Sequence, residues 1–188
     1  MESMFPKNIY LILLLGLVLC GCLNKPRDRK PENFQIQGAF NTLENKSATP
    51  KAFAVSTAVH VLLDSASSLK VKDSLADERQ LMQLDGKAHF TIAQATQPIV
   101  IYTGMMKLTT RDVEFSINAY SESPGQSLKV LNGQLIATKS YPSDFPNTDT
   151  LHKGEMILIN RDIDLMEKET FDTSQVPASP GAQPDPGR

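Results

Sequence analysis

Histidines are the first side chains of this sequence to consider for metal or acid–base chemistry. There are three of them, His60, His89 and His152. No two have the close spacing that places two imidazoles on one metal ion. His60 and His89 fall on the polar side of alternating segments, and His152 lies in a predicted turn, so solvated rings are the simpler interpretation. We expect no metal site and no cofactor.

Paired carboxylates are the second group with suitable chemistry. Asp112 and Glu114 share one face of a predicted strand, and Asp162 and Asp164 share another. Two such groups can act as general acid and base where their surroundings separate their pKa values. Exposed strand charges are the simpler interpretation, and the sequence holds no Gly-x-Ser-x-Gly motif and no glycine-rich phosphate loop. We therefore predict that the chain is not an enzyme.

The two cysteines, Cys20 and Cys22, close an apolar run that begins at Ile9. The run is about eleven residues long, whereas a membrane-spanning helix needs about twenty, so it is typical of a secretory signal peptide. Leu19-Cys20-Gly21-Cys22 resembles the lipobox of bacterial lipoproteins. The resemblance implies cleavage before Cys22 and lipidation of its thiol, which would anchor the chain stably at a membrane. An uncleaved signal anchor is the alternative.

The expected location follows from this anchor. Leu23, the residue after the lipidation site, resembles the signal for outer-membrane sorting. We expect a lipid-anchored protein of the cell envelope, at the outer membrane and facing the periplasm. Three Asp-Ser/Thr-aliphatic tripeptides fit short glycosylation sites of some Bacteroidetes, with chance occurrence as the alternative. They begin at Asp64, Asp73 and Asp149.

The length and net charge of the chain limit the number of domains and the classes of function that remain. The chain has 188 residues, 19 basic and 21 acidic side chains and a net charge of -2, which fits one domain and argues against nucleic-acid binding. We expect a signal peptide at 1–21, a polar tether at 22–51, a β domain at 52–160, and an acidic, then proline-rich and disordered tail at 161–188. Phe34, Ile36 and Phe40 in the tether are candidates for a first strand.

The β domain is predicted from alternation of apolar and polar residues with a period of two. About ten short strands separated by turn signals indicate an all-β fold, either solenoid-like or sandwich-like. Asn132-Gly133 is the strongest hairpin signal, because both residues accept positive φ. A helical turn within 73–83 is the one competing pattern. The predicted strands lie around 59–63, 69–72, 79–84, 88–92, 99–103, 107–111, 114–119, 128–131, 134–139 and 155–160.

Six short segments between residues 55 and 159 resemble, in order, the periplasmic domain of FecR-type sigma-factor regulators. Leu84–Ala93 is similar to that family's Leu-x-Gly-Glu-Ala-x-Phe-x-Val-Ala segment, with Lys87 in place of the usual Glu. Arg111-Asp112-Val113 departs from the usual Leu-Gly-Thr. The other five segments are 63–69, 98–103, 115–120, 131–135 and 151–155. The resemblance implies a β-solenoid-like lobe. We expect the chain to lack that family's cytoplasmic segment, transmembrane helix and second lobe, and so to carry no signal across a membrane by itself.

These observations favour a lipid-anchored, noncatalytic binding module that contacts an envelope protein or assists extracytoplasmic signalling. Strand addition at an open sheet edge is the expected mode. We expect the contact around Met105, Met106, Arg111 and Asp112. Two alternatives stay open: a small envelope hydrolase or carbohydrate-processing enzyme that uses the carboxylates, and a structural lipoprotein.

Overall fold

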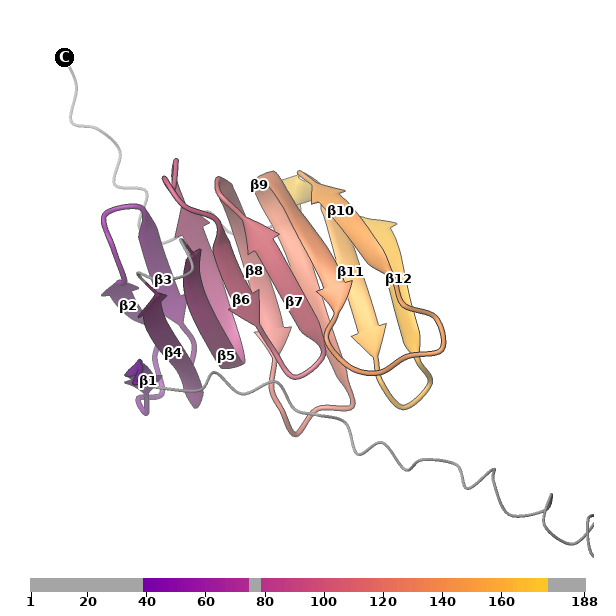
Figure 1. Cartoon of the computed structure of the whole chain (residues 1–188), viewed down its shortest axis with the longest axis horizontal. Coiled ribbons are helices and arrows are strands. Elements are labelled where there is room, and N and C mark those ends of the chain that lie inside the picture. The colour runs from indigo at the N-terminus through magenta and orange to yellow at the C-terminus, as the bar shows by residue number, and fades with distance from the viewer. Residues whose placement is uncertain (1–38, 75–78, 176–188) are drawn as a thin grey trace, which may run out of the picture. The chain divides into compact units, whose positions relative to one another are not determined.

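The computed structural model describes residues 39–74 and 79–175, which belong to one compact unit (Figure 1). The predicted lipidation site Cys22, the candidate strand residues Phe34 and Ile36, and the proline-rich tail lie outside the described residues. No helix in the described ranges is long and apolar enough to span a membrane.

The described residues form an all-β fold, as predicted. Twelve strands extend from β1 and β2 at one end of the domain to β10 and β12 at the other, as Figure 1 shows, and a short 3-10 helix, η1, comes last in the chain. The elements are β1 (Asn41–Asn45), β2 (Lys51–Ala54), β3 (Val59–Leu63), β4 (Ser67–Ser74), β5 (Arg79–Ile92), β6 (Ile99–Tyr102), β7 (Met106–Thr110), β8 (Val113–Ala119), β9 (Gly125–Lys139), β10 (Thr148–His152), β11 (Glu155–Asn160), β12 (Leu165–Thr170) and η1 (Thr173–Gln175).

The strands build two sheets that share β5 and β9. The first sheet has the order β1-β4-β5-β6-β7-β9-β10. The second has the order β2-β3-β5-β8-β9-β11-β12. All neighbours are antiparallel except β5 and β6, which are parallel. The edges of the two sheets are therefore β1 and β2 at one end and β10 and β12 at the other.

Glycines mark the corners where the shared strands pass between sheets. Gly86 in β5 has a φ of 118°, and Gly133 in β9 has a φ of 75°. A Cβ on Gly86 would lie 2.7 Å from the Cα of Ser67, and one on Gly133 would lie 3.0 Å from the Cα of Val113. The predicted hairpin at Asn132-Gly133 is wrong, because the two halves of β9 pair with different strands in different sheets. The positive φ serves a corner instead of a hairpin turn.

The core lies between the two sheets and is built by the predicted alternation. Val59, Val61 and Leu63 of β3 are buried, and the polar neighbour His60 is exposed. Phe90 of β5 and Phe115 of β8 are opposite each other, with ring centroids 4.9 Å apart. Burial of one such side chain stabilises the fold by about 1.5–3 kcal/mol.

The strands extend beyond the expected β domain at both ends. β1 lies in the expected tether, β12 lies in the expected tail, and β10 has no predicted counterpart. These are polar strands at the sheet edges, and Met166 is the one buried side chain of β12. These strands form because they pair with a neighbouring strand, and their sequences show little alternation of apolar and polar residues. Within 73–83, the described residues belong to β4 and β5, so the predicted helical turn is wrong there.

Candidate functional site

The predicted partner contacts divide into two buried and two exposed residues. Met105 is 2% exposed and Met106 is 0% exposed, so the prediction that they form a contact surface is wrong. Their backbone N–H groups donate to Thr103 Oγ1 in the β6–β7 turn, and their side chains pack in the core. Arg111 and Asp112 are exposed between β7 and β8, and their role stays a prediction.

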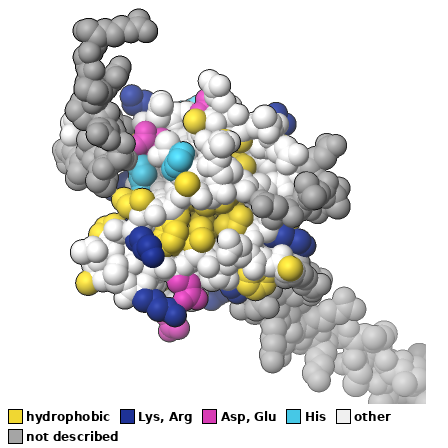
Figure 2. Space-filling model, turned by 90° about the vertical axis from the view of Figure 1, so that its left-hand side faces the viewer, with side chains coloured by type: hydrophobic (Ala, Val, Ile, Leu, Met, Phe, Trp, Pro, Cys, Tyr) yellow, Lys and Arg dark blue, Asp and Glu magenta, His cyan; other side chains and the backbone are white. Residues whose placement is uncertain are grey.

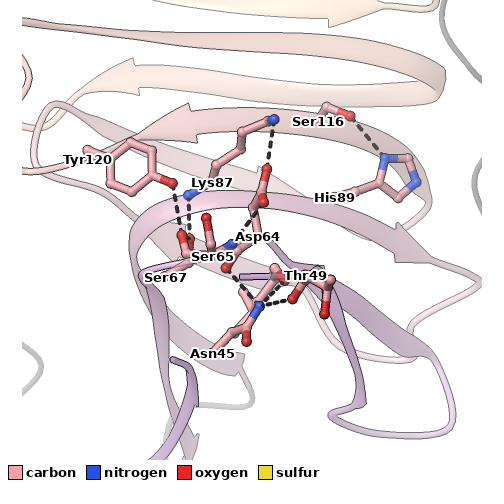
Figure 3. A network of polar contacts seen from close by, with 10 residues as sticks. Asn45, Thr49, Asp64, Ser65, Ser67, Lys87, His89, Ser116 and Tyr120 are labelled. Atoms are coloured by element: carbon pink, nitrogen blue, oxygen red, sulfur yellow. Dashed lines mark hydrogen bonds and ion pairs between the residues drawn. The ribbon is translucent and has the colours of Figure 1, made fainter. Parts of the chain in front are cut away.

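One histidine has partners that the sequence does not reveal. His89 Nδ1 lies 2.9 Å from Ser116 Oγ, a contact drawn in Figure 3, and its Nε2 lies 3.1 Å from Glu114 Oε1. The contact follows from register, since His89 of β5 faces Ser116 of β8. Serine, imidazole and carboxylate are the groups of a nucleophilic relay, but neither pocket described below is lined by any of them. No group of three metal-ligating residues occurs in the described ranges.

The other predicted carboxylate pair is separated by its contacts. Asp164 is bound to Lys139, whose side chain is 2% exposed, while Asp162 is exposed. Lys139 and Ser143 donate hydrogen bonds to the Asp164 carboxylate and lower its pKa to about 2. An ionised carboxylate held in this way is a poor proton donor, so Asp162 and Asp164 do not form an acid–base pair.

A polar network stiffens the β1 end of the domain (Figure 3). Asn45, buried at the end of β1, donates from Nδ2 to the carbonyl oxygens of Thr49, Leu63 and Asp64 at 2.9, 2.9 and 3.1 Å. The Asp64 carboxylate forms a 2.8 Å ion pair with Lys87, which lowers the pKa of Asp64 and raises that of Lys87. The network joins β1, β3 and β5 and fixes the geometry of this end.

An apolar surface lies at this end of the domain, near the two edge strands (Figure 2). Leu43 of β1, Phe53 of β2, and Val55 and Ala58 in the β2–β3 turn are partly buried against the core. Figure 2 looks onto this end of the domain and shows apolar atoms gathered at its centre, with lysine or arginine side chains around them. These side chains are only partly buried, and a further strand added to each sheet would cover them.

Lysines lie around this apolar surface. Lys51 Nζ lies 5.1 Å from the ring centroid of Phe53, and Lys70 Nζ lies 5.0 Å from that of Phe40, which is 42% exposed. These distances are those of cation–π contacts. Lys46 pairs with Glu44 at 2.8 Å. We call the surface of Leu43, Phe53, Val55, Lys51 and Lys70 the lysine-rimmed end.

The β2 edge has outward main-chain donors. The N–H of Val55 donates to the carbonyl of Val59 at 2.9 Å, so Val55 belongs to the residues bonded toward β3. Hydrogen bonding alternates along an edge strand, which leaves the N–H groups of Ala52 and Ala54 facing outward. The lysine-rimmed end therefore combines apolar surface, positive charge and main-chain donors.

The hydrolase alternative needs a pocket in which two carboxylates converge. Two pockets are relevant to it. A pocket of about 590 Å³ lies between the β2–β3 turn and the β5–β6 connection, and the described residues that line it include Arg79, Gln94 and Gln97 but no carboxylate. A pocket of about 210 Å³ has Asp85 as its one carboxylate. Within the part of the chain that the structure describes, neither of these pockets brings two carboxylates together.

Comparison with known proteins gives similarity in fold. The sequence matches no protein family and no curated protein. Two crystal structures of a predicted anti-sigma factor from Parabacteroides distasonis ATCC 8503, at 2.50 and 1.65 Å resolution, are similar to the chain with TM-scores of 0.63 and 0.62 and 16% identity. They cover 72% and 71% of this chain, and the chain covers 62% and 61% of theirs.

This similarity is relevant to the predicted link with sigma-factor regulation, but not to the particular family. Both neighbours are named for regulation of sigma factors, which is compatible with the predicted resemblance, but neither is named as FecR-type. At 16% identity the comparison shows a shared fold, and the chain spans less than two thirds of these neighbours.

Proposed function

We propose that this chain is a noncatalytic binding module of extracytoplasmic signalling, anchored by lipid at Cys22, that docks a partner protein at its lysine-rimmed end. One observation supports the docking proposal most strongly. Among the described residues, β1 and β2 each pair with a strand on one side only, and partly buried apolar side chains lie beside them. A partner strand would bond to the outward N–H groups of β2 and cover Phe53 and Val55.

Charge selects the kind of partner. Lys51 and Lys70 stand over aromatic rings at the rim. An acidic extended segment complements this surface, and electrostatic attraction raises its rate of association. The fold shared with predicted anti-sigma factors supports a regulatory role. The lipobox resemblance supports a lipid-anchored position outside the cytoplasm, and Leu23 after the lipidation site supports the outer membrane, facing the periplasm.

Photo-cross-linking in intact cells tests the docking surface. A photoreactive amino acid replaces Ala54 on the β2 edge. Gln134 of β9, which is exposed and pairs with His152 of the far edge strand β10, is the matched control position. We expect one discrete product from position 54, none from position 134, and loss of the product when Lys51→Glu and Lys70→Glu are combined. No product from position 54, together with turnover of a glycan by the purified chain, would contradict the proposal.

A further inference from the structure

The second pocket, of about 210 Å³, is lined by residues of both sheets and of the turns that join their strands. Buried Leu84, Met105 and Ala119 supply its apolar lining. Thr103 and Gly104 come from the β6–β7 turn, Gln126 from β9, and Arg161 from the β11–β12 turn. Its volume is several times the roughly 30 Å³ that one water occupies in the liquid. It therefore has room for more than one bridging water.

Gln126 lines this pocket with an unused donor. The residue is 4% exposed, and its Nε2 has no hydrogen-bond partner among the described residues. Thr103 fixes the orientation of the amide, because its Oγ1 accepts the N–H of Met106 at 2.9 Å and donates to Gln126 Oε1 at 2.6 Å. The amide oxygen is thereby turned to Thr103, and the NH₂ group is left for another acceptor.

Arg161 supplies a second donor group in the same pocket. It is half-buried, and no carboxylate in the described ranges forms an ion pair with it. Asp85, the pocket's carboxylate, already accepts hydrogen bonds from the N–H and Oγ of Ser121 at 2.8 and 3.0 Å. The unused groups of the pocket are thus donors, one of them cationic.

We propose that this pocket binds a small aliphatic carboxylate, with its oxygens on Gln126 Nε2 and the Arg161 guanidinium and its carbon body against Leu84 and Met105. A planar guanidinium and an NH₂ group match the two oxygens of a carboxylate. The carboxylate can belong to a free acid or to the C-terminus of a peptide. This inference is separate from the proposed docking at the lysine-rimmed end and does not rest on it.

Nuclear magnetic resonance titration of the acyl-free Cys22→Ser chain tests the proposal. The probes are propionate and its neutral counterpart propionamide, followed by trialanine with a free or an amidated C-terminus. We expect propionate to shift the side-chain NH₂ resonances of Gln126 and to bind at least tenfold more tightly than propionamide. Stronger binding of free-ended trialanine than of propionate assigns the carboxylate to a peptide terminus, and the reverse assigns it to a free acid.

Variants separate the pocket from nonspecific binding. A Cβ on Gly104 would lie 3.3 Å from Gln126 Nε2, and Gly104 does not have positive φ, so Gly104→Ala should fold normally and abolish binding. Arg161→Gln should weaken binding at least fivefold, and Arg79→Gln, at the exposed start of β5 and outside this pocket, should leave it unchanged. Equal binding of propionate and propionamide, no shift of the Gln126 resonances, or unaltered binding by Gly104→Ala would overturn the proposal and leave ordered water as the occupant.

Discussion

Lys139 Nζ lies 2.8 Å from Asp164 Oδ1, and this contact joins the end of β9 to the turn between β11 and β12. The same ammonium donates to the carbonyl oxygens of Asp164 and Phe145 at 2.9 and 3.0 Å. The lysine side chain is 2% exposed, and burial of an ammonium group is costly unless such partners accept its hydrogen bonds. The contact fixes two turns that no local sequence pattern connects.

The first prediction concerns acid stability at this contact. The pKa of Asp164 is lowered from 3.8 to about 2, chiefly by Lys139 and then by Ser143. The ionised carboxylate therefore contributes stability that is complete above the unfolded value near 3.8 and is lost as the pH falls through about 2. We expect urea unfolding to show a steeper loss of stability between pH 5 and 2 in the parent than in Asp164→Asn. Parallel pH profiles would contradict this assignment.

The second prediction concerns the corner of β9. Gly133→Ala combines positive φ with a Cβ 3.0 Å from the Cα of Val113. Gly154 also has positive φ, at 82°, but its nearest Cβ contact would be 3.7 Å away, so Gly154→Ala is the matched control. We expect Gly154→Ala to cost about 1–2 kcal/mol for the backbone alone. The loss for Gly133→Ala should be clearly larger in chemical denaturation, and equal losses would show that β9 does not turn as described.

The third prediction concerns the stacked aromatic pair. Phe90 and Phe115 lie with their rings 7° from parallel. Replacement of each by leucine, singly and together, forms a double-mutant cycle. We expect a coupling free energy of about 1 kcal/mol, the usual value for aromatic pairs beyond their burial. The same cycle on Phe90 and Leu128, which lie on strands that are not neighbours, is the control, and a coupling no larger than in this control would count against the packing.

The fourth prediction concerns the anchor. Metabolic labelling with a fatty acid should label the parent chain and not Cys22→Ser, because the lipobox resemblance assigns the lipid to that thiol. Cys20→Ser is the matched control and should keep the label. A label on Cys22→Ser, or none on the parent, would remove the anchor from the proposed function.

The sequence predicts the strands best where burial is regular. The predicted bounds of β3 and β11 agree with the structure, since alternate residues such as Val59, Val61 and Leu63 all enter the core. Gly86 and Gly133 signal a change of chain direction, but their sequence does not distinguish a hairpin from a corner between sheets. That difference is set by pairing partners far along the chain.

The candidate sites were harder to predict for a related reason. Met105 and Met106 are of a residue type that is common in contact surfaces, but the turn at Thr103 directs both side chains into the core. The lysine-rimmed end depends on β1 and β2, whose polar sequences give weak alternation. The amide orientation of Gln126 depends on Thr103, which is 23 positions away in sequence.

Hydrogen–deuterium exchange on β2, with and without the cross-linked partner, tests the central claim most directly. The N–H groups of Ala52 and Ala54 face outward, whereas the N–H of Val55 is already bonded to Val59. We predict that partner binding slows exchange at Ala52 and Ala54 and changes Val55 little, and that Lys51→Glu combined with Lys70→Glu removes the effect. Unchanged exchange at Ala52 and Ala54, with new protection elsewhere in the domain, would contradict docking by strand addition at this end.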